Sequence, residues 1–222
     1  MKITDLRWIF VGLLAVWLVQ TFISSAELTN VFTLSNNQLV ARTNPFDLGC
    51  SLVLLVLYLF LVNAKVSNTA GCLPGVFRRF IAFWIDLIAM VTLLAPIMAF
   101  IPLFAEWVRT SGDLQWALER TATSTGEIIF FTSLLFVGLL LTLLYFAIPM
   151  MNHRPTPGAC VMGYRIVPDS GTALTLKKAL LRTCVGFVAA CAAWAAPFLG
   201  RNREEGKFWL DLVFSTHAVK LN

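Results

Sequence analysis

Long apolar blocks without charge dominate this sequence. A transmembrane helix needs roughly 20 apolar residues to cross the ~30 Å hydrocarbon core of a bilayer. Four blocks reach or approach that length: residues 8–24, 48–62, 80–104 and 128–151. Of the 222 residues, 58% are hydrophobic and 13% are charged, whereas about a quarter of a soluble domain is charged. The sequence therefore predicts an all-α integral membrane protein whose first partner is the lipid bilayer.

A fifth block, residues 180–200, has a different composition. It is rich in glycine and alanine and is interrupted by Pro197. Small residues let helix backbones approach closely, so this block is expected to pack against protein more than against lipid. It either spans the membrane or re-enters and returns, and the re-entrant interpretation is preferred. The prediction is thus four or five transmembrane helices.

The first block has two interpretations. Positive charge precedes it, and Ser24, Ser25 and Ala26 resemble the small-residue cleavage site of a signal peptide. Tryptophans at both ends make it bulky for a signal peptide, so retention of residues 1–26 as a membrane helix is favoured.

The basic residues predict an orientation. Lys and Arg accumulate in cytoplasmic loops of membrane proteins. With the N-terminus inside and a re-entrant fifth block, only Arg42, Arg109 and Arg120 of the 17 basic residues lie outside. We therefore expect a multi-pass protein of a bacterial-type inner cell membrane with a cytoplasmic N-terminus. The same rule explains the net charge of +5, so no nucleic-acid partner is expected.

The connections between the blocks carry local patterns. In the first outer loop, residues 27–47, the turn residues Ser35-Asn36-Asn37 lie between two short apolar stretches and predict a β-hairpin. In the third connection, Asp113 is a good N-cap for a short helix at the outer interface. The positions at helical spacing behind it are Leu114, Ala117, Leu118 and Thr121.

The fourth connection also predicts a hairpin. Residues 164–167 and 172–176 read as strands, and residues 168–171 between them read as a turn. A small cytoplasmic β-hairpin is therefore expected between the fourth helix and the fifth block.

Familiar catalytic and metal-binding motifs are missing from the sequence. His153 and His217 have no second ligand at metal spacing, and no nucleophile with a partner base is recognisable. The five cysteines form no CxxC pair and are expected to be free thiols. The chain is therefore predicted not to be an enzyme and to need neither cofactor nor metal.

One constellation of charge remains within the membrane blocks. Arg79, Ala82 and Asp86 occupy i, i+3 and i+7 and share one stripe of the third helix. An Asp inside a span costs roughly 2.5–3.5 kcal/mol on insertion scales, so Asp86 needs a partner. Arg79 is one candidate, although seven residues rise ~10.5 Å, and Arg182 is the other. Asp211 is a second acid that would complete the network with the remaining arginine.

At these residues the sequence resembles the RDD family of membrane proteins. The matching region covers roughly residues 75–222, which leaves residues 1–74, two helices with the outer loop 27–47, as an N-terminal addition. Ala159 stands where the family usually has lysine. The residues that carry the resemblance are Arg79, Ala82 and Asp86, then Thr156, Gly158, Gly163, Gly171 and Arg182, and finally Asp211 and Thr216. Cation–proton exchange is suggested for some members of this family, so the resemblance implies transport as one possible function.

Two functions are weighed on this basis. The first is a non-catalytic accessory or scaffold subunit that packs against other membrane protein subunits or against itself. The second is a small-ion or solute transporter, in which Asp86 binds a cation or proton and Arg79 sets its pKa.

Overall fold

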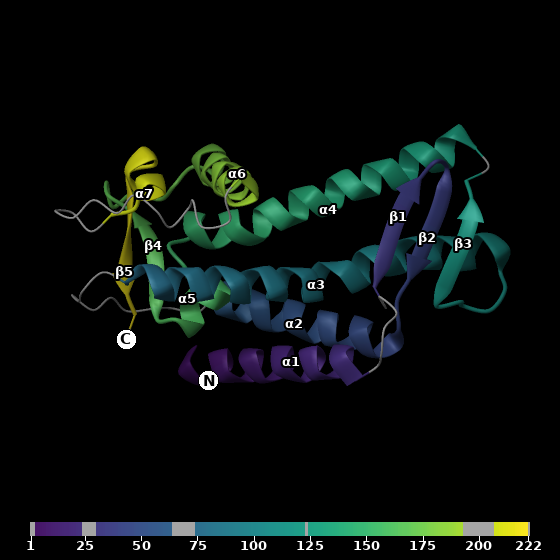
Figure 1. The fold of residues 1–222 in the computed structure, drawn as a ribbon, viewed down its shortest axis with the longest axis horizontal. Helices are drawn as coiled ribbons and strands as arrows, with labels where there is room; N and C mark the ends of the chain where they lie inside the picture. The colour runs from purple at the N-terminus through teal and green to yellow at the C-terminus, as the bar shows by residue number, and fades with distance from the viewer. Residues whose placement is uncertain (1–2, 24–29, 64–73, 123, 193–206, 222) are drawn as a thin grey trace. The chain divides into compact units, whose positions relative to one another are not determined.

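The computed structural model is mainly helical, as predicted (Figure 1). It describes residues 3–23, 30–63, 74–122, 124–192 and 207–221. The four predicted apolar helices are present as α1 (Ile3–Ile23), α2 (Pro45–Asn63), α3 (Val76–Thr110) and α4 (Thr125–Met151).

Three of the described helices are long and apolar enough to cross a membrane. They are α2, residues Phe77–Thr110 of α3, and α4. The described apolar stretch of α1, Leu6–Thr21, is shorter. The fourth span and the retention of residues 1–26 therefore stay predictions. Only 17% of the apolar window of α4 is buried inside the protein, so this helix presents most of its apolar surface outward.

The chain forms two compact units. The first unit contains Met1–Val11, Leu57–Ile88 and Leu143–Asn222, and the second contains Gly12–Val56 and Ala89–Thr142. Segments of the two units alternate along the sequence, so the units do not correspond to the predicted domains 1–74 and 75–222. The predicted division at residue 74 stays a prediction.

The second unit contains a three-stranded antiparallel sheet. Its strands are β1 (Val31–Ser35), β2 (Gln38–Arg42) and β3 (Ala117–Thr121), in the order β1-β2-β3. Asn36 and Asn37 join β1 to β2 with φ of 50° and 63°, the left-handed conformation that a two-residue hairpin turn requires. The predicted hairpin about Asn36 and Asn37 is confirmed, whereas its place on the outer side of the membrane stays a prediction.

The predicted interfacial helix in the third connection is wrong. Residues 117–121 form β3, in which Leu118 pairs with Ala41 of β2. A stretch of only five residues can fit both the helical and the alternating apolar pattern. The stretch is a strand because it pairs with the edge of β2 that β1 leaves open. Beyond the strand itself, the Ala122 N–H donates to the Asn37 carbonyl at 2.7 Å and extends the pairing.

In the first unit the predicted second hairpin is half right. The first strand is present as β4 (Tyr164–Pro168), but it pairs antiparallel with β5 (Thr216–Lys220) and not with residues 172–176. Gly171 has φ of +69° and redirects the chain after β4. Thr175 then accepts a hydrogen bond from the Lys178 N–H at 3.4 Å, so this segment begins a helix instead of a strand.

That helix is α6 (Leu176–Ala192), which covers the first part of the fifth block. Residues 193–206, with Pro197, lie outside the described residues. Whether residues 180–200 span or re-enter the membrane therefore stays a prediction.

Two short helices complete the first unit: α5 (Pro157–Val161) and α7 (Trp209–Val213). A cluster of buried side chains, Ala82, Ala159, Tyr164 and Ala218, joins α3, α5, β4 and β5. This core brings the connection after α4 against the beginning of α3, where the charged residues lie.

Candidate functional site

Asp86 of α3 is 4% exposed, and its carboxylate accepts three hydrogen bonds. The Thr156 hydroxyl donates at 2.5 Å, the Gly158 N–H at 2.7 Å and the Tyr145 hydroxyl at 3.2 Å. The donors come from α4, α5 and the residue before α5. We call these four residues the Asp86 cluster. Its carboxylate is therefore satisfied by neutral donors on both oxygens.

The start of α5 is built for this contact. Thr156 is the N-cap, with φ of −66° and ψ of 162°, and its hydroxyl oxygen accepts from the Ala159 N–H at 3.3 Å while its proton goes to Asp86. Pro157 occupies the first turn, where its missing N–H costs nothing. One hydroxyl thus both starts the helix and binds the carboxylate.

Gly158 is required by the closeness of α3. A Cβ atom added there would overlap the Ala82 carbonyl oxygen and lie 2.9 Å from the Asp86 carboxyl carbon. Glycine lacks this atom and lets the two backbones approach. Ala82 and Gly158 are therefore explained as the two sides of one close backbone contact.

Tyr145 is itself held in place. Its ring stacks on Tyr58 with centroids 4.8 Å apart, and the Tyr58 hydroxyl donates to the Tyr145 carbonyl oxygen at 2.9 Å. The end of α2 thus positions the α4 tyrosine that reaches Asp86.

Asp211, in the first turn of α7, forms a second buried acidic site. The carboxylate is fully buried and is paired with Arg79 from α3 and with Arg182 from α6, the latter at 2.7 Å. The Thr216 hydroxyl donates to the same carboxylate at 3.4 Å. We call Arg79, Asp211 and Arg182 the Asp211 triad. Burial raises the pKa of Asp211, but the attraction of Arg182 and Arg79 and their hydrogen bonds lower it further, so that the pKa lies below 3.8.

The structure decides between the pairings that the sequence left open. Arg79 lies on Asp211, and its guanidinium stacks 4.2 Å from the centre of the Phe208 ring. The alternative pair of Arg79 with Asp86, which the sequence left open, is not formed among the described residues. Two physical reasons account for this: the ~10.5 Å rise between the two positions, and the three donors that already occupy Asp86.

A cavity of about 140 Å³ joins the two acidic sites. Both carboxylates and both triad arginines line it, together with the N-cap Thr156 and Arg154. The remaining lining is mainly apolar: Phe83, Phe146, Met150, Ala159, Tyr164, Ile166, Thr183, Gly186, Phe187, Phe208 and Leu210.

The other residues of the resemblance lie at turns and strands of the first unit. Gly163 links α5 to β4 with φ of +72°, a conformation that favours glycine. Its carbonyl oxygen accepts from the Leu221 N–H at 2.9 Å, next to the β4–β5 pairing. Gly171 occupies the turn after β4, and Thr216 begins β5 beside Asp211. None of these three side chains reaches the Asp86 carboxylate.

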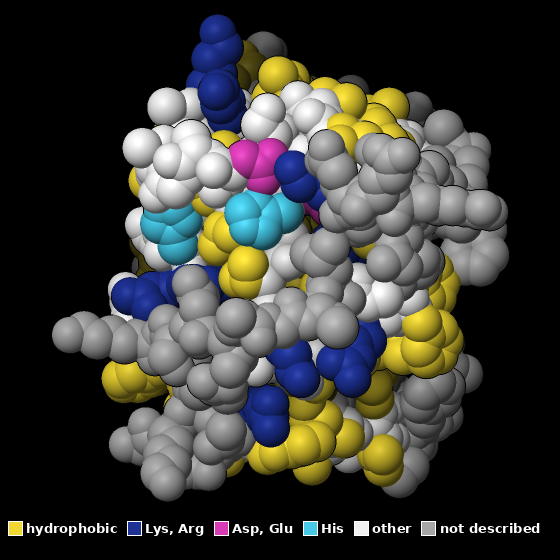
Figure 2. All heavy atoms as spheres, turned by 90° about the vertical axis from the view of Figure 1, so that its left-hand side faces the viewer, with side chains coloured by type: hydrophobic (Ala, Val, Ile, Leu, Met, Phe, Trp, Pro, Cys, Tyr) yellow, Lys and Arg dark blue, Asp and Glu magenta, His cyan; other side chains and the backbone are white. Residues whose placement is uncertain are grey.

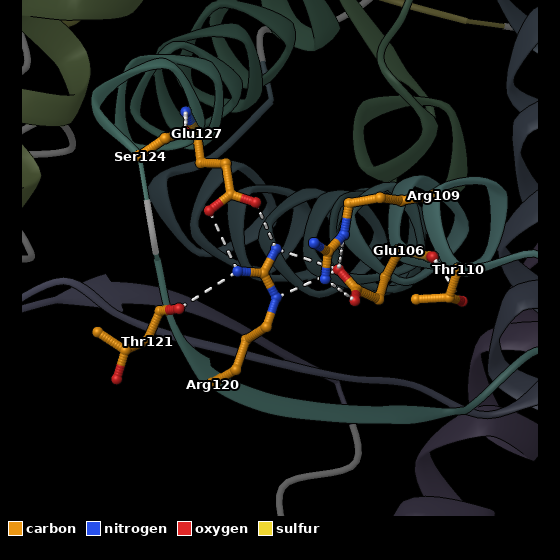
Figure 3. Close-up of polar contacts among 7 residues, drawn as sticks. All are labelled: Glu106, Arg109, Thr110, Arg120, Thr121, Ser124 and Glu127. Carbon is orange, nitrogen blue, oxygen red and sulfur yellow. Dashed lines mark hydrogen bonds and ion pairs between the residues drawn. The ribbon is translucent and has the colours of Figure 1, made fainter.

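The second unit holds an ionic cluster that sequence reasoning missed (Figure 3). Arg120 of β3 lies between Glu127, at 2.8 Å, and Glu106, at 3.1 Å. Arg109 also contacts Glu106, at 2.5 Å, but is more than half exposed. The available signal was an acid near the end of α3 and another in the first turn of α4, with one arginine in the connection between them.

Basic side chains recur on the surface of the first unit where β4, β5 and α7 lie (Figure 2). Asp169 there contacts Lys207 at 2.8 Å and His217 at 2.6 Å. Partial burial raises the pKa of Asp169, and the two basic partners lower it by more, so the pKa lies below its ordinary value. Within the described part of the chain, no three His, Cys, Asp or Glu side chains come together as ligands for a metal ion.

Comparison with known proteins gives one match. The model of the RDD family matches residues 73–215, which include both buried acidic sites. No curated protein and no solved structure matches the chain.

Proposed function

The chain belongs to the RDD family, and from this premise we propose that it is a non-catalytic accessory or scaffold subunit of a larger membrane assembly. The observation that carries the proposal is that side chains and backbone groups of the protein itself supply hydrogen bonds or ion pairs to both buried carboxylates. Asp86 binds α4 and α5 to α3, and Asp211 binds α6 and α7 to the same helix. Residues of the family resemblance therefore act as packing contacts.

A scaffold role also agrees with what the chain presents outward. In the described part of the second unit, β1 and β3 are the edges of the sheet, and each pairs with β2 alone. Unpaired strand edges are templates for another chain. The largely unburied apolar surface of α4 contacts lipid or another membrane helix. The proposed partners are other membrane protein subunits or a second copy of this chain.

The proposed location is a bacterial-type inner membrane with a cytoplasmic N-terminus. The support is the presence of several Lys and Arg side chains on the face shown in Figure 2, because Lys and Arg accumulate on the cytoplasmic side. Cysteine scanning with a membrane-impermeant reagent tests the orientation: a cysteine at position 170 in the turn after β4 should be protected in intact cells, and one at position 36 should react.

Native mass spectrometry of the protein, purified in mild detergent from its own membrane, tests the scaffold proposal. We expect a second polypeptide in fixed stoichiometry, and co-expression of the two chains should raise the yield of both. A homo-oligomer that exchanges cations for protons in proteoliposomes without any other subunit would contradict the proposal.

A second candidate is cation–proton exchange at Asp86. The observation in its favour is that Asp86 and Thr156 line the cavity, so a cation there would meet a carboxylate and a hydroxyl oxygen. The version in which a cation displaces Arg79 from Asp86 is dropped, because Arg79 is paired with Asp211. The substitution Asp86→Asn separates this candidate from the scaffold role.

A further inference from the structure

The cavity of the first unit is lined mainly by apolar side chains. Three phenylalanines from three helices form part of its wall: Phe83 of α3, Phe146 of α4 and Phe187 of α6. The ring centroids of Phe146 and Phe187 are 5.3 Å apart, and those of Phe83 and Phe187 are 6.4 Å apart, so the rings form one continuous aromatic surface. Cavities with a largely apolar and aromatic lining are typical sites for apolar ligands.

The two carboxylates of the lining are already satisfied by the protein. Asp86 accepts three hydrogen bonds from neutral donors, and Asp211 is paired with Arg79 and Arg182. The ring of Phe208 stacks on the Arg79 guanidinium at 4.2 Å and covers one of its faces. The apolar part of the lining is therefore what the cavity offers to a ligand.

The aromatic wall also reaches the surface of the first unit. Phe83, Phe146 and Phe187 are partly exposed, and the residues that follow two of them, Trp84 and Val188, are exposed apolar side chains. The other partly exposed residues of the lining belong to α6, to β4 and to the connection between α4 and α5. The cavity can therefore be entered along an apolar surface that α3, α4 and α6 supply.

The position of this surface along the helices indicates what lies against it. Phe83 lies six residues after the start of the apolar segment Phe77–Thr110, and Phe146 lies five residues before the end of α4 at Met151. At 1.5 Å per residue, both are roughly 7–9 Å from those ends. One headgroup layer of a bilayer is only roughly 5–7 Å thick, so the aromatic wall lies at the depth of the acyl chains.

We propose that this cavity binds the end of one acyl chain of a membrane lipid, which enters from the side of Phe146 and Phe187. An apolar cavity of about 150 Å³ holds one benzene molecule, so the volume of about 140 Å³ here has room for about six carbon atoms. Because lipid tails are as apolar as the wall, the gain is closer van der Waals contact with the aromatic rings. The site does not depend on the scaffold role.

Gly186 of α6 allows the cavity to be filled by substitution. It lines the cavity, and a Cβ atom added there would point to Leu210, another lining residue, at an ordinary 3.6 Å. Gly186→Leu therefore places a branched side chain in the space proposed for the lipid. Gly49→Leu is the matched control, because Gly49 is a helical glycine of α2 outside the lining, and a Cβ atom there would meet no atom within 4 Å.

Photo-crosslinking in nanodiscs tests the proposal. The lipid is phosphatidylcholine with a diazirine at the end of one acyl chain, and mass spectrometry locates the label. Met150 lines the cavity and is 5% exposed, whereas Ile148 is 37% exposed, lies outside the lining and reports general contact with lipid. We expect label on both residues. Gly186→Leu should lower the ratio of label on Met150 to label on Ile148 about tenfold, because a close-packed interior cannot hold both the leucine and the chain end. Gly49→Leu should leave the ratio unchanged.

The proposal is overturned if Met150 carries no more label than Tyr145, an equally buried residue of α4 outside the lining. An unchanged ratio in folded Gly186→Leu protein would also overturn it. If Gly186→Leu does not fold, Gly186→Ala replaces it, because its single methyl group meets only the ordinary contact with Leu210. This smaller filling should lower the ratio about twofold, and an unchanged ratio in Gly186→Ala would then overturn the proposal.

Discussion

The backbone N–H of Gly158 donates a 2.7 Å hydrogen bond to the carboxylate of Asp86, although 72 residues separate the two in the sequence. The same glycine lies so close to α3 that a Cβ atom would overlap the Ala82 carbonyl oxygen. One contact therefore requires a carboxylate on α3, a donor at the start of α5 and the absence of a side chain on that donor. The Asp86 cluster is a packing contact in which each residue type has a physical reason.

Gly158→Ala should weaken the fold. The added methyl group must push α5 away from α3, which lengthens the hydrogen bonds to Asp86 and costs about 2–3 kcal/mol of unfolding free energy. Unfolding in detergent, followed by the fluorescence of the tryptophans, measures the loss. Gly186→Ala in α6 is the matched control, because its Cβ would meet only the Leu210 side chain at an ordinary 3.6 Å. The control should be as stable as the wild type or slightly more stable. Equal stability of the two variants would contradict a close backbone contact between Gly158 and Ala82.

The Asp211 triad should make stability depend on pH. Because the folded pKa of Asp211 is depressed, its contribution is fully present above the ordinary value of 3.8 and is lost as the pH falls through the depressed pKa. Asp211→Asn should cost about 3–5 kcal/mol at pH 7, since it leaves two buried arginines without a counterion. Below pH 3.8 the difference between wild type and variant should shrink. Melting temperatures at pH 7, 5 and 3 measure this, and a constant difference across that range would contradict the depressed pKa.

Cys160 of α5 should react slowly with thiol reagents. Burial is the main cause that raises the pKa of this thiol to about 11, so little thiolate is present at pH 8. A variant with Cys160 as its single cysteine should label about a hundredfold more slowly than a variant with one exposed cysteine at Ser170. Comparable rates would show that α5 is not packed as described.

The ionic cluster of the second unit should depend on Arg120 more than on Arg109. Arg120 is 19% exposed and bridges two glutamates, so Arg120→Met should cost about 1 kcal/mol of unfolding free energy. Arg109 is mostly exposed and pairs with one glutamate of its own helix, so Arg109→Met should have no measurable effect. Chemical unfolding of both variants provides the comparison, and the reverse order would contradict the geometry in Figure 3.

The helices could be predicted from sequence because the bilayer imposes their length and apolarity on each block separately. The hairpin between β1 and β2 could be predicted for a similar reason, since Asn36 and Asn37 carry the turn within two residues. The strands β3 and β5 could not. Each is five residues long and pairs with a strand far away in sequence, β2 or β4, and no local pattern records that partner.

The candidate site was predictable in its residues but not in its pairings. The cost of burying charge singled out Asp86, Asp211, Arg79 and Arg182, and all four line one cavity. Which arginine meets which acid depends on α5, whose backbone N–H and N-cap hydroxyl occupy Asp86 first. A backbone donor leaves no signature in sequence, so Arg79 was equally plausible as a partner of either acid.

Asp86→Asn tests the central claim most directly, with the amount of folded protein and cation–proton flux in proteoliposomes measured on the same preparations. The neutral amide weakens the hydrogen bonds that join α3 to Thr156 and Gly158. The packing account predicts less folded protein and the loss of any co-purifying subunit, together with no flux in wild type or variant. Wild-type levels of folded, fully assembled Asp86→Asn protein that has lost a flux present in the wild type would contradict that account and assign Asp86 to transport.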